Sequence, residues 1–296
     1  MKEIAENILI ETDYEGVTVG AILTDRGVVM IDTPLSPKDT MSWRATSSRS
    51  AGGTDRLLVL LDEHYDRTSG ASSIKCPIIT HEKTALVLSG RPSSKASVDI
   101  TGTIWEENEQ LMTTRWMQPE ITFTQNLTIN WGDTEILLEH HPGPSRGSTW
   151  VIVPKRQVAF IGDTVTPGQP PFLANADIDE WLDALHKLIL VRFRDYALIS
   201  GRGELVNKQD IKEQQKFLRK IHRRMDRLAS SKAKSSKVEE AGAGYVDDFQ
   251  AKTKKEAEAF RNRLSYGFVQ YFSNHYPKKT EKQPPKYDGF TSHSPC

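Results

Sequence analysis

The feature that most constrains the fold is a series of short, apolar, β-rich runs that form two groups along the chain. The first group spans residues 7–61 and ends with Leu57–Leu61, which is apolar at every position. Such a run is typical of a strand that is buried on both faces, in a sheet that helices cover. The second group spans residues 121–161, and a last strand is expected at 196–199.

Helical patterns follow both groups of strands. A helix is predicted to begin near Pro37 and to run through Trp43, and residues 178–189 carry apolar side chains on one helical face. Two groups of strands with helices around them indicate an α/β fold in which two sheets pack face to face. The predicted architecture is therefore a four-layer αββα sandwich with a helical C-terminal extension.

The C-terminal third changes in composition. A basic amphipathic helix is predicted over 207–229, and we place it in a first domain of residues 1–229. Residues 230–245 are polar and rich in Gly, Ser and Lys, so we expect a flexible linker or loop. A C-terminal helix is predicted over 246–276, and the Pro-, Lys- and Ser-rich residues 277–296 are expected to be a disordered tail.

Charge and composition narrow the classes of partner. The chain has 39 basic and 39 acidic residues, so its net charge gives no reason to expect nucleic acid or an anionic membrane as a partner. No run approaches the roughly 18 apolar residues of a membrane span. The N-terminus has no signal-peptide pattern, and a cytoplasmic protein is expected.

The basic helix 207–229 has two interpretations. A solvated helix face is favoured over a nucleic-acid surface, because no aromatic side chains are interleaved with its charges. An acidic partner for this face, and a homodimer contact through 246–276, remain open. The positive face is formed by Lys216, Arg219, Lys220, Arg223, Arg224 and Arg227.

Four segments place charged or histidine side chains directly after predicted strands, where α/β folds carry their chemistry. Residues 61–70 read Leu-Asp-Glu-His-Tyr-Asp-Arg-Thr-Ser-Gly, and residues 140–148 read His-His-Pro-Gly-Pro-Ser-Arg-Gly-Ser. Residues 159–164 read Ala-Phe-Ile-Gly-Asp-Thr, and residues 198–203 read Leu-Ile-Ser-Gly-Arg-Gly.

Together with Gly-Val-Val-Met-Ile-Asp-Thr at 27–33, these segments resemble the metallo-β-lactamase superfamily over about residues 5–225. That family reads Thr-His-x-His-x-Asp-His-x-Gly-Gly, then Pro-Gly-His-Thr-x-Gly-Ser, then Gly-Asp, then Gly-His-Gly. The resemblance implies the αββα fold. It also implies two metal ions, held by five histidines and two aspartates, whose bridging hydroxide attacks the substrate.

The ligand positions of this family are only partly kept. The matching positions are His64, Asp66 and Asp163. Histidines of the family pattern are replaced by Asp62, Arg67, Pro144 and Arg202. An arginine or proline side chain offers no lone pair to a cation, so three of these four replacements cannot act as ligands.

The two metal positions are affected differently. The second metal would need ligands at Arg67 and Arg202, and we expect it to be excluded. At the first position Asp62, His64 and Asp163 remain, and they can hold one divalent ion such as zinc, iron or manganese. The expected cofactor is therefore either none or one such ion.

The arginines suggest a different use of the cleft. Asp62, Asp66 and Asp163 would repel one another without a cation, and we expect Arg67 and Arg202, with Arg146, to neutralise them.

Two other residues take expected roles from the resemblance. Asp66 would handle the proton in an active enzyme, and Asp32 would support the site structurally. His140 and His141 end a strand, and we expect them to serve hydrogen bonding or packing.

Three functions stay open on the sequence alone. The favoured one is a divergent member of the fold without ordinary dinuclear hydrolase activity, which acts as a binding protein or pseudoenzyme. The second is a mononuclear metal-dependent hydrolase that uses Asp62, His64 and Asp163. The third is a binding module for a small anionic ligand held by Arg67, Arg146 and Arg202.

Overall fold

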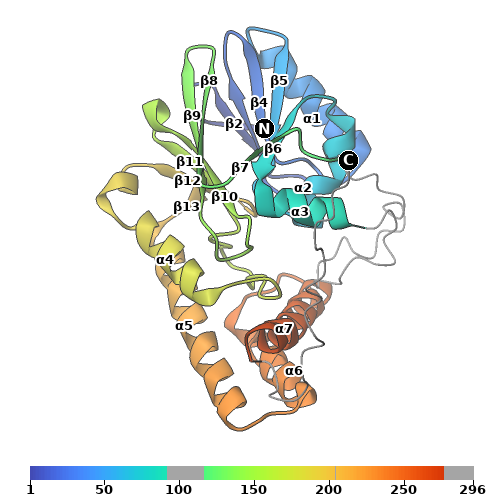
Figure 1. Ribbon diagram of the computed structural model, residues 1–296, viewed down its shortest axis with the longest axis vertical. Helices are drawn as coiled ribbons and strands as arrows, with labels where there is room; N and C mark the ends of the chain where they lie inside the picture. The colour runs from blue at the N-terminus through green and yellow to red at the C-terminus, as the bar shows by residue number, and fades with distance from the viewer. Residues whose placement is uncertain (92–116, 204, 277–296) are drawn as a thin grey trace, which may run out of the picture.

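The computed structural model describes residues 1–91, 117–203 and 205–276. Two mixed sheets pack against each other, with helices on both outer faces (Figure 1). The first sheet has the order β1-β2-β3-β4-β5-β6-β7. Its strands are β1 Lys2–Ala5, β2 Ile8–Glu11, β3 Val19–Leu23, β4 Gly27–Ile31, β5 Asp55–Val59, β6 Ile78–His81 and β7 Ile121–Phe123.

The second sheet has the order β13-β12-β11-β10-β9-β8. Its strands are β8 Asn126–Trp131, β9 Thr134–His140, β10 Thr149–Val153, β11 Val158–Gly162, β12 Ala197–Ser200 and β13 Leu205–Val206. Strands β4 to β7 run parallel to one another, and β11 is parallel to β12. The carboxyl ends of β4, β5, β11 and β12 therefore supply loops that can meet between the sheets.

Three hydrophobic clusters fill the spaces between the four layers. The central cluster joins the inner faces of the two sheets and includes Val29, Val59 and Phe160. A second cluster covers the outer face of the first sheet and contains Trp43 from helix α1 (Pro37–Ser50). The third lies outside the second sheet and contains Trp181 from helix α4 (Ile178–Leu188). This arrangement is the predicted αββα sandwich.

The helices enclose the two sheets and then extend beyond them (Figure 1). They are α1 Pro37–Ser50, α2 Tyr65–Thr68, α3 Glu82–Gly90, α4 Ile178–Leu188, α5 Lys208–Ser230, α6 Ser235–Ala243 and α7 Lys254–His275. Short 3₁₀ turns are η1 Ser69–Ser73, η5 Pro154–Arg156, η6 Val191–Phe193 and η7 Val246–Asp248. Among the described residues, no helix is long and apolar enough to cross a membrane.

Two predictions for the C-terminal part need correction. The segment 230–245 is not a continuous flexible linker, because it contains α6. Val238 of α6 is fully buried, and Gly242 lies so close to Phe268 of α7 that a larger side chain would collide. Packing against α7 thus outweighs a polar composition that disfavours a helix.

The predicted helix 246–276 is also shorter than expected. It is interrupted after η7, and α7 begins only after Thr253, whose side chain accepts a hydrogen bond from Glu256 N. Phe260, Leu264 and Phe268 of α7 belong to the same hydrophobic cluster as the outer face of the second sheet. The helical extension therefore packs onto the sandwich. The predicted tail 277–296 lies outside the described residues.

Candidate functional site

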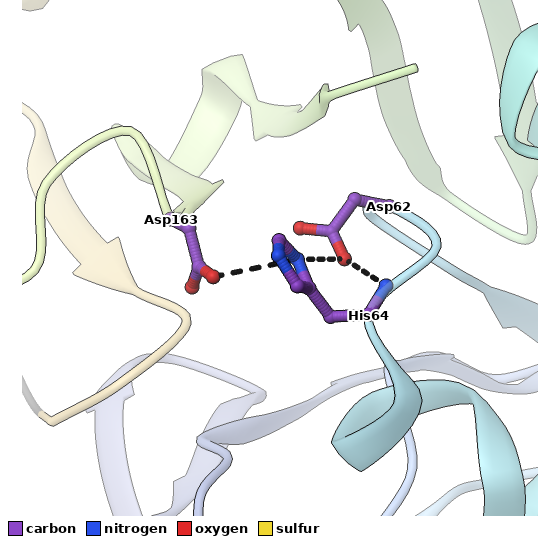
Figure 2. Close-up of side chains that lie close together, drawn as sticks. All are labelled: Asp62, His64 and Asp163. Atoms are coloured by element: carbon purple, nitrogen blue, oxygen red, sulfur yellow. Dashed lines mark hydrogen bonds and ion pairs between the residues drawn. The ribbon is translucent and has the colours of Figure 1, made fainter. Parts of the chain in front are cut away.

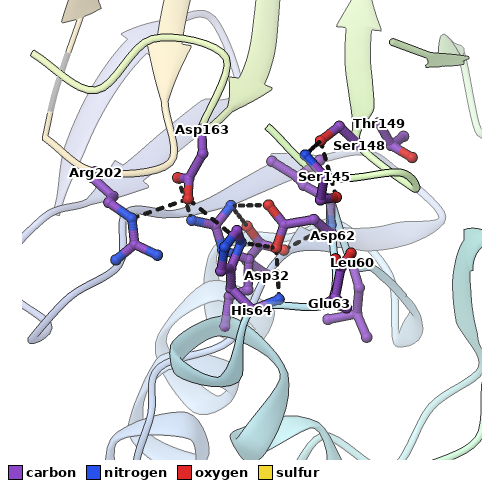
Figure 3. Close-up of polar contacts among 12 residues, drawn as sticks. Asp32, Leu60, Asp62, Glu63, His64, Ser145, Ser148, Thr149, Asp163 and Arg202 are labelled. Atoms are coloured by element: carbon purple, nitrogen blue, oxygen red, sulfur yellow. Dashed lines mark hydrogen bonds and ion pairs between the residues drawn. The ribbon is translucent and has the colours of Figure 1, made fainter. Parts of the chain in front are cut away.

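The predicted site residues converge from four loops at the carboxyl ends of strands (Figure 3). Asp32 follows β4, and the segment 62–67 follows β5 and enters α2. Asp163 follows β11, and Arg202 follows β12. The loops are far apart in sequence, but their charged groups form one cluster, which we call the arginine–aspartate cluster. Its members are Asp32, Asp62, Asp66, Arg67, Asp163 and Arg202.

Arg67 lies at the centre of this cluster and has no exposed surface. Its guanidinium joins two carboxylates: Nη1 donates to Asp62 Oδ2 at 3.0 Å, and Nη2 donates to Asp163 Oδ1 at 2.6 Å. Asp32 Oδ2 lies 3.6 Å from Nη1. These are charge-assisted contacts, which are stronger than neutral hydrogen bonds. Burial disfavours the charged guanidinium, but Asp163 and the other carboxylates outweigh it and raise the Arg67 pKa above its ordinary value.

Arg202 closes the cluster from the side of the second sheet. Its Nε donates to Asp163 Oδ2 at 3.1 Å, and its Nη1 donates to Asp66 Oδ2 and to the backbone oxygen of Gly16. The guanidinium lies over the ring of Phe172, with its carbon 4.3 Å from the ring centre. Both arginines therefore contact the carboxylates that the sequence led us to expect.

His64 lies between two of these carboxylates (Figure 2). Its Nδ1 is 2.9 Å from Asp62 Oδ1 and 3.5 Å from Asp163 Oδ2. Burial lowers the His64 pKa, but the charges of Asp62 and Asp163 outweigh burial, so the pKa is raised. The two carboxylates thus favour the protonated form of the imidazole.

The aspartates of the cluster differ in charge. Burial raises the pKa of Asp62, but Arg67 and His64 outweigh it and hold that pKa below its ordinary value. Burial acts in the same way on Asp163, where Arg202 and Arg67 outweigh it and lower the pKa. The opposite result holds for Asp32, because burial raises its pKa to about 8 despite the nearby Arg67. The arginines therefore stabilise the charged forms of Asp62 and Asp163.

Asp32 was expected from the resemblance to support the site structurally. Its backbone has a φ of 57°, in the left-handed region. Its Oδ1 accepts a hydrogen bond from Leu61 N at 2.9 Å, which links the loop after β4 to the end of β5. The residue is fully buried. It therefore holds the backbone that carries Asp62.

The pKa of Asp32 leads to a prediction about stability. Its folded pKa of about 8 lies above the ordinary value of 3.8, so the folded protein keeps a proton that the unfolded chain has released. Stability should therefore fall as pH rises from about 4 to about 8, by at most about 1.4 kcal/mol per pH unit. Urea unfolding at pH 5 and pH 8 measures this change. Asp32→Asn cannot titrate and should lose less stability over this range; equal losses in both proteins would contradict the prediction.

The positions of the possible ligand atoms show which residues could bind a metal ion. One donor atom each from Asp62, His64 and Asp163 lies within 4.8 Å of the other two, and this is the one such group among residues 1–91, 117–203 and 205–276. All four carboxylate oxygens of Asp62 and Asp163 already contact a nitrogen of His64, Arg67 or Arg202. A single metal ion could be bound by these three residues, but it would compete with those nitrogens for the carboxylate oxygens.

The second metal position does not fit its residues. Arg67 and Arg202 occupy two of its ligand positions, and their charged nitrogens face Asp66 and Asp163. Guanidinium nitrogens have no lone pair for a cation and repel it electrostatically. The residues at this position therefore do not fit a second metal ion.

The loop after β9 places its predicted residues differently. Pro144 is buried and has no donor atom, so it cannot replace the lost histidine. Arg146 is exposed, and within the described part of the chain no contact joins its side chain to Asp66 or Asp163. The expectation that Arg146 neutralises these carboxylates is therefore wrong, because this loop turns its side chain to the surface.

The two histidines at the end of β9 take part in packing and hydrogen bonding, as expected. His140 stacks on His81, with ring centres 3.8 Å apart, and its Nε2 hydrogen-bonds to the oxygen of Arg146. His141 stacks on Trp150, with ring centres 3.7 Å apart, and its Nε2 lies 3.0 Å from Glu139.

The sequence analysis missed Phe172, which covers one side of the cluster. Its ring contacts His64, with ring centres 5.0 Å apart, and lies beneath both Arg202 and Arg263. Phe172 is only 5% exposed. No motif marks this position, because its role depends on a loop and a helix that meet only in the folded chain.

Helix α7 holds the loop that carries Phe172. Arg263 Nη1 donates to Gln169 Oε1 at 3.1 Å and to the oxygen of Pro170 at 2.9 Å. Asn274 Nδ2 donates to the oxygen of Ala174 at 3.1 Å. The C-terminal extension thus contributes to the wall of the site. Its basic and aromatic positions were visible in the sequence, but their partners were not.

Comparisons with known proteins agree with this fold. Residues 63–203 match the model of the Metallo-beta-lactamase superfamily. A metallo-beta-lactamase from Pontibacter korlensis has a TM-score of 0.58 at 19% identity and covers 74% of this chain and 97% of its own. The DIM-1 metallo-beta-lactamase exposed to ceftazidime has a TM-score of 0.57 at 18% identity. The match covers 74% of this chain and 95% of that protein.

A double mutant of the sec-alkyl sulfatase PisA1 is similar over more of this chain. It has a TM-score of 0.65 at 13% identity and covers 97% of this chain and 52% of its own. That coverage includes the C-terminal helices. At these identities the likeness concerns the fold. No curated protein sequence matches the chain.

Proposed function

We propose that the chain is a member of the metallo-beta-lactamase superfamily, whose model matches residues 63–203, and that the arginine–aspartate cluster has replaced the two-metal centre. The protein then acts as a binding protein of this fold and not as a dinuclear hydrolase. One observation carries the proposal. Arg67 and Arg202 are both buried, and each donates to a different oxygen of Asp163, the aspartate that would bridge two metal ions.

The chemistry of hydrolysis supports the same conclusion. A dinuclear enzyme of this kind needs a metal-bound hydroxide as its nucleophile. Arg67 and Arg202 supply positive charge to the cleft but cannot lower the pKa of a water by coordinating it. Asp66, the residue that would handle the proton, accepts a hydrogen bond from Arg202 instead. This carboxylate therefore stabilises the cluster.

A mononuclear hydrolase is the second candidate, and the close approach of Asp62, His64 and Asp163 favours it. Two carboxylates and an imidazole form a workable ligand set for zinc, iron or manganese. His64 Nδ1 would then have to be unprotonated and face the ion. In this alternative Arg67 would keep its contact with Asp163 beside the ion.

Anion binding by the same arginines is less well supported. Arg67 and Arg202 direct their donors at carboxylates, and Arg146 is exposed outside the cluster. An anion would have to displace buried aspartates from buried guanidiniums, which is costly.

Elemental analysis of the protein as purified tests the proposal. We expect zinc, iron and manganese to be far below one ion per chain, and His64→Ala to leave that content unchanged. The matched control is His186→Ala, which alters an exposed histidine on α4. One ion per chain that is lost in His64→Ala but kept in His186→Ala would overturn the proposal and establish the mononuclear site.

A further inference from the structure

A cavity of about 510 Å³ lies between α5 and α6, away from the arginine–aspartate cluster. These two helices belong to the end of the molecule that extends beyond the sheets (Figure 1). Cavities of this volume are large enough for a small organic ligand. The lining residues are Arg224, Arg227, Lys237, Glu240, Tyr245 and the small residues Ala241 and Gly244.

The charges around this cavity are unbalanced. Arg224 and Arg227 lie about one turn apart on α5, and Lys237 faces them from α6. Glu240 is the only acidic residue in the lining. Three cations and one carboxylate leave a surplus of two positive charges. Within the described part of the chain, none of these four side chains forms an ion pair.

Tyr245 adds a flat aromatic wall to the cavity. Its ring is held by Phe268, with ring centres 5.4 Å apart, and by Phe217, at 6.0 Å. Lys220 lies over the same ring, with Nζ 4.7 Å from the ring centre, and pairs with Asp248. Tyr245 is therefore fixed in place, and its exposed part can contact an apolar group of a ligand.

From these observations we infer that the cavity binds a phosphate monoester that carries an aromatic group. A phosphate monoester bears a charge of about −1.5 to −2 at neutral pH, which matches the surplus in the lining. Arginine binds phosphate oxygens through two parallel hydrogen bonds, and Arg224 and Arg227 provide two such groups. The aromatic group of the ligand would lie against Tyr245.

Part of the basic face of α5 lines this cavity. The sequence favoured a solvated face for the positive side of this helix, and its Arg219 and Arg223 are exposed. Arg224 differs, because it is only partly exposed and borders the cavity together with Arg227 and Lys237. The inference does not depend on the proposed loss of the metal centre, because the two sites share no residue.

Isothermal titration calorimetry of the full chain with phenyl phosphate tests this inference. We expect one saturable site, and Arg224→Gln and Lys237→Gln should each weaken binding by about tenfold, since each removes a hydrogen bond between charged groups. Lys232→Gln is the matched control, because Lys232 is exposed near α6 but does not line the cavity. It should leave the affinity unchanged.

Two further measurements test the role of the aromatic group and the alternative that the basic face binds nucleic acid. Tyr245→Leu should weaken binding of phenyl phosphate but not that of inorganic phosphate. Failure of phenyl phosphate to bind, or equal affinity in wild type, Arg224→Gln and Lys237→Gln, would overturn the inference. A single-stranded oligonucleotide that binds more tightly than phenyl phosphate and is weakened equally by Arg219→Gln would also overturn it, because the basic face would then be a nucleic-acid surface.

Discussion

Arg67→Met is expected to lower the free energy of unfolding by about 3–5 kcal/mol, because it leaves buried carboxylates without their cation. Arg67 contacts Asp62 and Asp163, both of which are nearly inaccessible to solvent. Methionine fills a similar volume but supplies neither charge nor hydrogen bonds. Chemical denaturation at neutral pH measures the loss.

Two other variants keep this prediction testable if Arg67→Met does not fold. Arg67→Lys retains the charge but cannot bridge two carboxylates, so its loss should be intermediate. Arg223→Met removes an exposed arginine from α5 and should change stability by less than about 0.5 kcal/mol. Equal stability of wild type and Arg67→Met would mean that the guanidinium does not hold the cluster together.

The second large effect is expected from restoring the histidines of the family pattern. A variant with Asp62→His, Arg67→His, Pro144→His and Arg202→His removes both guanidiniums and adds four imidazoles. We expect it to bind zinc at about two ions per chain, because five histidines and two aspartates then surround the cleft. Zinc at about a thousand times its dissociation constant should stabilise the variant by about 4 kcal/mol for each ion bound.

A variant that keeps the arginines separates their effect from that of the added histidines. Asp62→His with Pro144→His leaves Arg67 and Arg202 in place, so it should bind at most one zinc ion. Zinc titration followed by thermal unfolding distinguishes the two variants. If the fourfold variant binds no more zinc than wild type, the arginines are not what excludes the metals.

Much of the sandwich was predictable because its strands are defined locally. The apolar run Leu57–Leu61 and the alternation around Ala21 mark buried strands without reference to the rest of the chain. Helix α6 could not be predicted in this way. Its sequence is polar and contains glycine, and it is helical because Val238 and Gly242 pack against α7. Such a tertiary contact leaves no periodic signal in a short segment.

In the site, too, some residues could be predicted from the sequence and others depend on contacts between distant segments. The family pattern identified Asp62, His64 and Asp163, and simple electrostatics predicted that Arg67 and Arg202 would pair with the aspartates. The same argument failed for Arg146, because the loop geometry that directs its side chain outward is not encoded in charge. Neither could the sequence indicate that a loop held by α7 places Phe172 over the cluster.

The central claim is that guanidiniums occupy the place of the metal ions. A crystal grown with zinc, with diffraction data collected at the zinc absorption edge, tests it most directly. The account predicts no anomalous peak between Asp62, His64 and Asp163, with the Arg67 guanidinium within hydrogen-bond distance of both aspartates. An anomalous peak bonded to all three residues, with Arg67 displaced from Asp163, would contradict it.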